Sequence, residues 1–258
     1  MKYFTQPPIG TPLNPAHPLN QGLVGYWPMG EGGGTRVNDI SGNGNHGVAN
    51  MVQGTSSGWT GGKYGRAVRF NGISDKISVP NITLNGTVFS ISAWVNLNTP
   101  TAGCMIFGQG NSANGNPIVS IQMFSGTTFE LANRNDSTSG LLSYPAFTYF
   151  VDRWYHIVWT CTLNESMLYV NGVLINTVGF SVNSGATINT SFIGVRQRGL
   201  NESFFNGRIE QVRIYKRVLP IFEARQLYTD PFCMYEQENK YRWFNTFDRK
   251  GSFFFSRL

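Results

Sequence analysis

The sequence predicts an all-β fold: a two-sheet antiparallel β-sandwich of the jelly-roll type, with an extended N-terminal arm and an aromatic-rich C-terminal arm. Three features of the composition support this prediction. Charged residues are only 13% of the 258 residues, aromatic residues are 14%, and 30 Gly with 12 Pro mark frequent turns. Short apolar runs between frequent turns are typical of β-sandwiches. The same composition excludes a coiled coil, a collagen and a disordered chain.

Strand and turn patterns alternate along the chain. Residues 1–21 carry five prolines, which favour an extended arm rather than a domain. A first strand is expected at 22–27, and the Gly- and Asn-rich stretch at 30–47 has the composition of turns. Further strands are expected at 67–70, 76–79, 89–97, 105–107, 118–124, 128–131, 154–160, 167–170, 173–175, 191–194 and 207–215.

Two of these patterns are especially informative. Residues 89–97 alternate with period two, which places one apolar face on the core; its members are Phe89, Ile91, Ala93, Val95 and Leu97. Asn171 and Gly172 stand between two apolar runs and predict a tight hairpin. One helix is expected at 221–228, with Pro220 at its first helical position.

The charge does not favour a nucleic-acid partner. The net charge is +6, but residues 196–258 hold 12 Lys and Arg against 7 acids, so most of the surplus lies in the last quarter. The basic residues there alternate with aromatic and acidic ones, and no nucleic-acid motif accompanies them.

Cysteine and histidine are too few and too scattered for a disulfide framework or a Cys/His metal cluster. Cys104, Cys161 and Cys233 allow at most one disulfide, and Cys161 is interpreted as a small buried hydrophobe. The first residues lack the apolar core of a signal peptide, so export is expected to use another route. No run of about 18 apolar residues predicts a membrane span.

Four segments, taken in order, resemble one family. They read GLVGYWPMGEG and DISGNGNHG (22–32, 39–47), GRAVRFNGISDKI (65–77), FSISAWV with RWYHIV and LYVNG (89–95, 153–158, 168–172), and FNGRIEQVRIYKRVL (205–219). Together they resemble the laminin-G-like jelly rolls of the concanavalin A-like lectin/glucanase superfamily. The resemblance covers about residues 22–228 and implies a domain at 22–232 between arms at 1–21 and 233–258.

The superfamily includes glycan hydrolases and lyases, so the resemblance raises the question of whether this chain has catalytic residues. Retaining hydrolysis needs two carboxyl groups about 5–5.5 Å apart, which a strand supplies from residues two positions apart. Here only Glu236 and Glu238 are spaced in this way, and both lie outside the resemblance. We therefore expect a protein that is not an enzyme, although a carboxylate pair from separate strands stays open. His156 is interpreted as a strand histidine packed among aromatic residues.

The resemblance also implies one structural calcium ion. The positions that match the family's site are Asp39, Asn71, Asp75 and Glu210. Oxygen-rich loops suit calcium, but Asn71 and Ser74 replace acids that are frequent in the family, and Gln211 follows Glu210 where two acids are common. The alternative is that these side chains only hold turns.

Glycan binding in this fold uses aromatic platforms beside amide or acidic side chains. The loop candidates are Trp59, Tyr64, Arg134, Asn135, Asp136 and Tyr149. For each of them, packing in the core or in a turn is the alternative.

The segment 233–258 holds eight aromatic residues among its 26. Such a tail must fold back on its own sandwich or bury against another protein, because exposed it would form a large apolar patch. The residues expected to dock are Tyr241, Trp243, Phe244, Phe247, Phe253, Phe254 and Phe255. The partner is expected to be a capsid or another copy of this chain.

Three functions compete. The first is an outward-facing structural or adhesion component of a virus particle, such as a phage capsid decoration or fibre protein, with potential glycan binding. It accounts for both arms and for the missing carboxylate pair. The second is a carbohydrate- or protein-binding lectin-like module of a cellular surface protein, located outside the cell. A polysaccharide hydrolase or lyase is the third and is the least supported by the residues.

Overall fold

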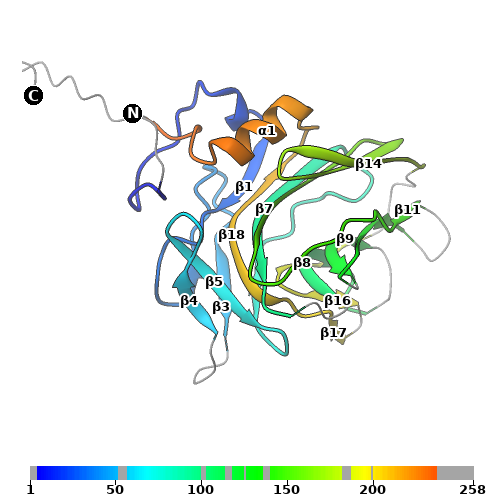
Figure 1. Cartoon of the computed structure of the whole chain (residues 1–258), viewed down its shortest axis with the longest axis horizontal. Helices are drawn as coiled ribbons and strands as arrows, with labels where there is room; N and C mark the ends of the chain where they lie inside the picture. Colours follow the sequence, from blue (N-terminus) through cyan, green and yellow to red (C-terminus); the bar gives the residue numbers. More distant parts are fainter. Residues whose placement is uncertain are drawn as a thin grey trace, which may run out of the picture.

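The computed structural model describes residues 5–51, 57–99, 103–113, 118–124, 126–135, 140–181, 187–198 and 200–236. Two eight-stranded antiparallel sheets pack against each other as a sandwich, as predicted (Figure 1). Half of the strand pairings in these two sheets join strands that are not consecutive in the chain, such as β7 with β18 and β8 with β15.

The first sheet has the order β14-β13-β12-β7-β18-β5-β4, with β1 also paired to β18. Its strands are β1 (Leu23–Trp27), β4 (Gly58–Gly61), β5 (Arg66–Asn71), β7 (Phe89–Leu97), β12 (Trp154–Cys161), β13 (Glu165–Val170), β14 (Val173–Gly179) and β18 (Asn206–Tyr215).

The second sheet has the order β11-β10-β9-β8-β15-β6-β3-β2. Its strands are β2 (Arg36–Val37), β3 (Gly47–Asn50), β6 (Lys76–Ser78), β8 (Cys104–Gly110), β9 (Ile118–Phe124), β10 (Thr128–Arg134), β11 (Gly140–Ser143) and β15 (Thr190–Ile193).

A small hairpin, β16 (Arg196–Arg198) and β17 (Leu200–Glu202), crosses the outer surface of β8. The crossing is close at Gly108, where an added Cβ would lie 2.9 Å from the carbonyl oxygen of Val195 and 3.1 Å from Cα of Arg196. Both neighbours are backbone atoms, so only glycine lets the two chain segments approach this closely.

The main core lies between the two sheets. The five apolar residues of β7 all belong to it, which confirms the period-two prediction; Phe89, Ile91, Ala93, Val95 and Leu97 are each at most 1% exposed. The Asn171–Gly172 turn is also confirmed, because it joins the antiparallel strands β13 and β14 and both residues have positive φ (50° and 74°). Such a turn matches the twist of the strands it connects.

A second apolar cluster lies on the outer side of the first sheet, beneath α1 (Ile221–Thr229). The helix buries Ala224 and Leu227 against the sheet, and Glu223 in its first turn accepts a hydrogen bond from Arg217 at 3.0 Å. Pro220 is the N-cap residue, one position earlier than predicted. This helix and the 3-10 helix Pro18–Asn20 are too short to span a bilayer, and the described part of the chain contains no longer one.

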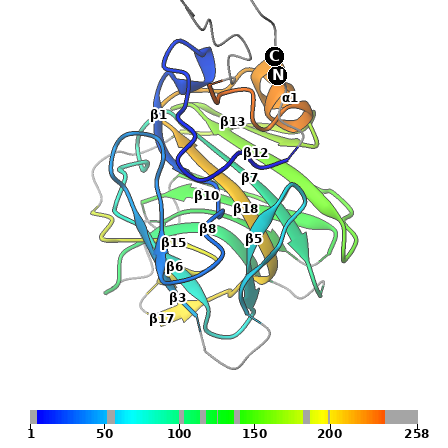
Figure 2. The same ribbon diagram turned by 90° about the vertical axis from the view of Figure 1, so that its left-hand side faces the viewer.

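The two ends of the described chain lie side by side at one end of the sandwich (Figures 1 and 2). Leu13 forms an antiparallel bridge with Tyr235, Asn14 donates its N–H to Met234, and Glu236 donates its N–H to Pro12. Residues 5–21 thus run along the sandwich, where Leu19 is fully buried.

The strands that the sequence patterns missed are the short ones: β2, β3, β4, β11, β16 and β17. Each has two to four residues, so none is long enough to show an alternation.

Candidate functional site

The outer surface of β9, β10 and β11 carries polar and aromatic side chains of mixed exposure: Leu142 and Tyr144 are exposed, whereas Ser120, Gln122 and Glu130 are buried. Alternate residues of β9 point into the core, and the remaining ones, Ser120, Gln122 and Phe124, face outwards. The pairing register places Glu130 opposite Gln122 and Ala132 opposite Leu142. We call this surface the open face; its members are Ser120, Gln122, Phe124, Glu130, Arg134, Leu142 and Tyr144.

An aromatic pair lies at one end of the open face. The rings of Phe124 and Tyr144 are 5.7 Å apart and inclined by 49°. The segment after Tyr144 is pinned to the β9–β10 turn, since Phe129 donates its N–H to Pro145 at 2.9 Å. Tyr144 keeps 49% of its surface exposed and Leu142 keeps 42%. The pair is therefore held in place, yet accessible from outside.

A buried ion pair supports the aromatic pair. Nη1 of Arg196 lies 2.8 Å from Oε1 of Glu130, and both side chains are less than 10% exposed. Arg196 comes from β16, so this contact joins the hairpin to the sheet. Burial raises the pKa of Tyr144, and the nearby carboxylate of Glu130 raises it further.

Four buried polar atoms on or beside the open face have no partners within the described part of the chain. Oγ of Ser120, Oε1 of Gln122, Nε of Arg134 and Oδ1 of Asn135 are buried and have no hydrogen-bond partner among the described residues. Leaving a buried polar group unpaired costs about 1–3 kcal/mol. A polar ligand or water that reaches these atoms would regain part of that free energy.

The outer surface of the first sheet carries more titratable groups but is covered. We call it the closed face; its main members are Ser92, Trp94, His156, Glu210 and Arg213, and α1 with residues 230–235 lies over them. All five are at most 1% exposed.

Ser92 and His156 on the closed face have the spacing of a nucleophile and its base, with 2.9 Å between Oγ and Nε2. They lack the other requirements of such a pair. Both are fully buried, and Nδ1 of His156 has no partner among the described residues. Burial, together with the nearby charge of Arg213, lowers the pKa of His156 to about 3. His156 packs against Trp94 and Tyr228, as the strand-histidine interpretation predicted.

Arg213 organises the rest of the closed face. Its Nη2 donates to the hydroxyl of Tyr26 and to the carbonyl of Pro231, each at 2.6 Å, and the guanidinium lies 4.1 Å from the Tyr26 ring centre. Gln211 at positive φ (57°) accepts from the same guanidinium at 3.0 Å. These contacts join β1, β18 and the segment after α1, which is a structural role.

Of the predicted glycan-binding residues, Arg134 and Asn135 lie at the end of β10 beside the open face. Asp136 lies outside the described residues. Tyr149 was expected as an accessible ring, and the structure corrects this: it is only 4% exposed, packs on Phe129, and accepts the N–H of Gly126 at 2.7 Å. The apolar ring fills the core where the chain returns to the sheet.

The other two aromatic candidates lie away from the open face. Trp59 is on β4, at the far edge of the first sheet, and donates to the carbonyl of Gly34 at 2.9 Å. Tyr64 packs edge-on against Trp94 and Phe232, with ring centres 5.3 and 5.6 Å apart. Burial raises the pKa of Tyr64 to about 12. The structure therefore brings together only two of the predicted set, Arg134 and Asn135.

The structure does not gather the predicted calcium ligands. The described residues contain no group of three or more His, Cys, Asp or Glu side chains suited to a metal. The carboxylate of Asp39 already accepts hydrogen bonds from the backbone of Tyr26, Ser41 and Asn45, and from the Ser41 hydroxyl.

The remaining three predicted ligands also form hydrogen bonds within the protein, although Oε1 of Glu210 is buried without a partner among the described residues. Asp75 accepts the N–H of Asn71 at 2.9 Å, while Glu210 accepts the N–H of Lys63 at 3.0 Å. Burial raises the pKa of Glu210 to about 8. These four residues do not fit a shared calcium site, and calcium binding stays a prediction. The docking residues between Tyr241 and Phe255 lie outside the described residues.

The sequence reasoning missed Gln122, Phe124, Glu130, Tyr144 and Arg196. A signal for the first three was present, since polar or aromatic residues alternate with apolar ones along 118–124, and Glu130 interrupts an apolar strand. Arg196 and Tyr144 meet the open face only through tertiary contacts.

Comparison with known proteins agrees with this architecture. A laminin-G-like family model, described as the concanavalin A-like lectin/glucanases superfamily, matches residues 70–221. The chain belongs to this superfamily. None of the curated protein sequences matches the chain.

Solved structures of the superfamily share the jelly-roll fold at low sequence identity. Domain 4 of a GH43 extracellular arabinanase from Geobacillus stearothermophilus, in complex with arabinotriose, has a TM-score of 0.61 at 21% identity, covering 80% of this chain and 97% of that one. Trypanosoma rangeli sialidase in complex with sialic acid gives 0.59 at 19% identity, covering 84% of this chain and 34% of the sialidase. The binding domain of Paraclostridial Mosquitocidal Protein 1 gives 0.60 at 19%, covering 83% and 53%.

Proposed function

We propose that this jelly roll is a non-catalytic carbohydrate-binding module that binds a short oligosaccharide on its open face. The observation that carries the proposal is the half-exposed ring of Tyr144, held against Phe124 beside a buried carboxylate–guanidinium pair. Binding sites for small ligands combine an apolar or aromatic surface with a few fixed polar groups. A short oligosaccharide stacked on Tyr144 would extend along β10 towards Arg134, which pairs with Gly140 at the other end of β11.

The residues of the open face do not favour hydrolysis. Glycoside hydrolysis uses two carboxyl groups, and Glu130 is the single acid among the described residues of this face. Its carboxylate is engaged by Arg196 at 2.8 Å. On the closed face, Ser92 and His156 are sealed beneath α1. Binding without turnover is therefore the function that fits these side chains.

The superfamily neighbours support a carbohydrate ligand. One is an arabinanase domain in complex with arabinotriose, and another is a sialidase in complex with sialic acid. Because their identity to this chain is 21% or lower, they support the ligand class rather than a particular sugar.

The test is a glycan array followed by calorimetry with the best ligand. Tyr144→Ala is expected to weaken binding at least tenfold, about 1.4 kcal/mol. Phe222→Ala is the matched control, since Phe222 is 66% exposed on α1, away from the open face, and should leave affinity unchanged. Absence of any glycan ligand at millimolar protein, or equal affinity for Tyr144→Ala, would refute the proposal.

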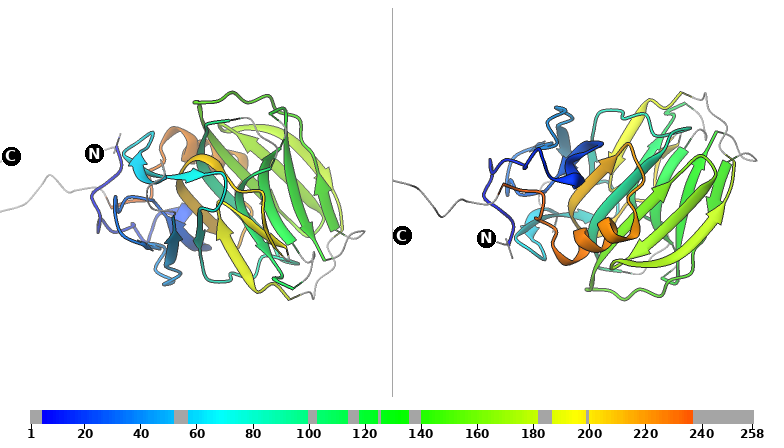
Figure 3. Two further views of the ribbon diagram at one scale, coloured as in Figure 1. Left: turned by 90° about the horizontal axis from the view of Figure 1, so that it is seen from below. Right: turned by 90° about the horizontal axis from the view of Figure 1, so that it is seen from above.

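We further propose that the module acts at the surface of a virus particle, as a capsid decoration or fibre protein, with the terminal segments as its anchor. The supporting observation is that residues 5–14 and 231–236 lie together at one end of the sandwich, while β9–β11 lie at the other (Figure 3). An anchor at one end would direct the open face outwards. The alternative is a lectin-like module of a cellular surface protein, which needs no anchor of this kind.

Removal of 237–258 tests the anchor. The shortened chain is expected to bind its glycan normally but to be lost from purified particles. Incorporation at the normal level would exclude these residues as the anchor, whereas loss of glycan binding would indicate a folding defect and would be checked by thermal unfolding.

A further inference from the structure

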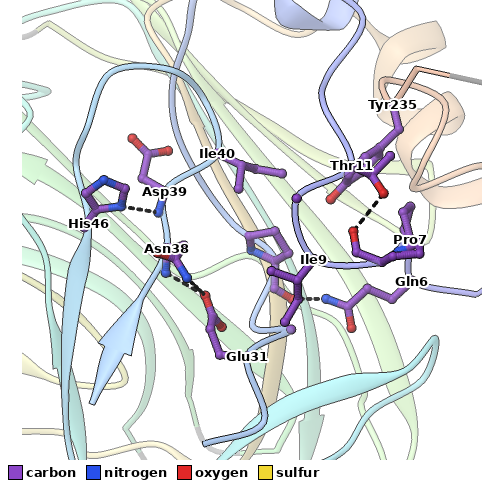
Figure 4. A pocket seen from close by; sticks show the side chains of 14 residues that line it. Gln6, Pro7, Ile9, Thr11, Glu31, Asn38, Asp39, Ile40, His46 and Tyr235 are labelled. Atoms are coloured by element: carbon purple, nitrogen blue, oxygen red, sulfur yellow. Dashed lines mark hydrogen bonds between the residues drawn. The ribbon is translucent and has the colours of Figure 1, made fainter. Parts of the chain in front are cut away.

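A cavity of about 330 Å³ lies between the N-terminal segment and the loops that follow β1 and β2 (Figure 4). Residues 6–11 form one wall and Tyr235 closes one end. Its apolar surface comes from Pro7, Pro8, Ile9 and Ile40. A cavity of this size is at the lower end of the range for ligand pockets, so it suits one or two side chains better than a large molecule.

The polar lining of this cavity is acidic. Glu31 and Asp39 belong to it, and the described lining residues include neither Lys nor Arg. Asp39 is fully engaged by backbone and hydroxyl donors, as described above. Glu31 is different: its Oε1 accepts from the backbone and side chain of Asn38 at 2.6 and 3.0 Å, while Oε2 is buried with no partner among the described residues. The cavity therefore has one carboxylate oxygen in need of a donor.

The wall of the cavity is also where the described chain ends. Tyr235 lines the cavity, and the next residue, Glu236, donates its N–H to Pro12 at 2.9 Å. The bridge between Leu13 and Tyr235 is antiparallel. The described chain therefore ends beside the turn at Pro8–Thr11, which forms the cavity wall.

Residues 237–258 have the chemistry that this cavity lacks. They contain five Lys and Arg against two acids, together with seven aromatic residues. Lys240 and Arg242 alternate with Tyr241 and Trp243 only four to seven positions after Glu236. At about 3.3 Å per extended residue, four to seven residues reach about 13–23 Å. A tethered segment also binds at high effective concentration.

We propose that residues 237–258 of the same chain dock into this cavity, with an aromatic side chain against Pro7, Pro8 and Ile9 and a basic side chain on Glu31. The contact covers the apolar wall and supplies the missing donor to Oε2 of Glu31. It does not depend on glycan binding. In an assembly, the segment would have to leave this cavity before it could anchor the module elsewhere.

Limited trypsin digestion of the full chain tests the proposal. Cleavage after Lys240 and Arg242 is expected to be at least tenfold slower than in a synthetic peptide of residues 237–258. Glu31→Gln keeps the Oε1 acceptor for Asn38 but removes the charge, so it should speed cleavage at these two sites several-fold. Glu165→Gln, at an exposed acid elsewhere, should leave cleavage unchanged.

Two further measurements decide the remaining outcomes. Ile9→Ser, at a side chain that is 71% exposed, should also speed cleavage without loss of thermal stability. Light scattering should give a monomer. Cleavage as fast as in the peptide, or unaffected by Glu31→Gln and Ile9→Ser, would overturn the proposal. Protection in a dimer would assign the cavity to the segment of a second copy and overturn the intramolecular contact.

Discussion

The outer faces of the two sheets differ in how far the rest of the chain covers them. On the closed face, His156, Glu210 and Arg213 are buried beneath α1 and the segment that follows it. On the open face, the small β16–β17 hairpin crosses β8 and its Arg196 reaches Glu130 on β10, while Tyr144 and Leu142 stay exposed. The closed face holds the more reactive-looking groups, including a Ser–His contact, yet has no access for a ligand. Shifted pKa values alone are therefore a poor guide to the functional site in this molecule. The open face is the better candidate because some of its side chains are accessible to a ligand.

The largest expected effect tests whether the closed face is structural. Arg213→Ala removes the donor to the carbonyl of Pro231 and one of the partners of the Tyr26 hydroxyl, and it leaves a cavity beneath residues 231–235. We expect a loss of about 3–5 kcal/mol in the free energy of unfolding, measured by urea denaturation. Arg208→Ala, on the same strand but half-buried, should cost under about 1 kcal/mol. Equal losses for the two variants would contradict the structural role of Arg213.

The next largest effect tests the buried ion pair between Glu130 and Arg196 on the open face. Glu130→Gln leaves the Arg196 guanidinium buried without its counter-charge, so we expect a loss of about 3 kcal/mol in unfolding free energy. The double variant Glu130→Gln with Arg196→Met should recover most of this loss, because no unpaired charge remains. A double variant as unstable as the single one would mean that the pair does not act as a unit.

The pH dependence of stability tests two buried groups of the closed face, Glu210 and His156. The folded pKa of Glu210, about 8, lies above its ordinary value of 4.5, so the folded state holds the proton more tightly. Stability from this group is present below pH 4.5 and is lost as the pH rises towards 8. The slope is at most about 1.4 kcal/mol per pH unit.

His156 acts in the opposite direction. Its folded pKa of about 3 lies below the ordinary 6.5, so stability is lost as the pH falls from 6.5 towards 3. The two effects oppose each other between pH 4.5 and 6.5, where we expect a plateau. Glu210→Gln should abolish the decline above pH 6.5 in urea titrations, and an unchanged decline would assign it to other groups.

The smallest expected effect concerns calcium. Since the carboxylate of Asp39 is occupied by four donors, we expect EDTA to lower the melting temperature by less than about 1 °C. A drop of several degrees that calcium reverses would restore the predicted ion, because a ligand that binds the folded state stabilises it.

The sequence predicted the sandwich, its long strands and the β13–β14 hairpin, since alternation and Asn-Gly turns are local signals. It predicted less of the candidate site. Arg134 and Asn135 were proposed from a loop pattern, and their role in glycan binding stays a prediction, whereas Tyr149 is buried. An aromatic residue in a turn-rich stretch has the same appearance in sequence whether it is buried or exposed. Tyr144 was missed for the same reason.

Local periodicity along the chain was enough to determine which side of each long strand faces the core, because neighbouring side chains in a strand point in opposite directions. Contacts between residues far apart in the sequence determine which outer face is covered. Tyr26 and Arg213 are 187 positions apart, and Glu130 and Arg196 are 66 apart. Only the folded chain brings such pairs together, and so only the tertiary structure separates the buried polar face from the accessible one.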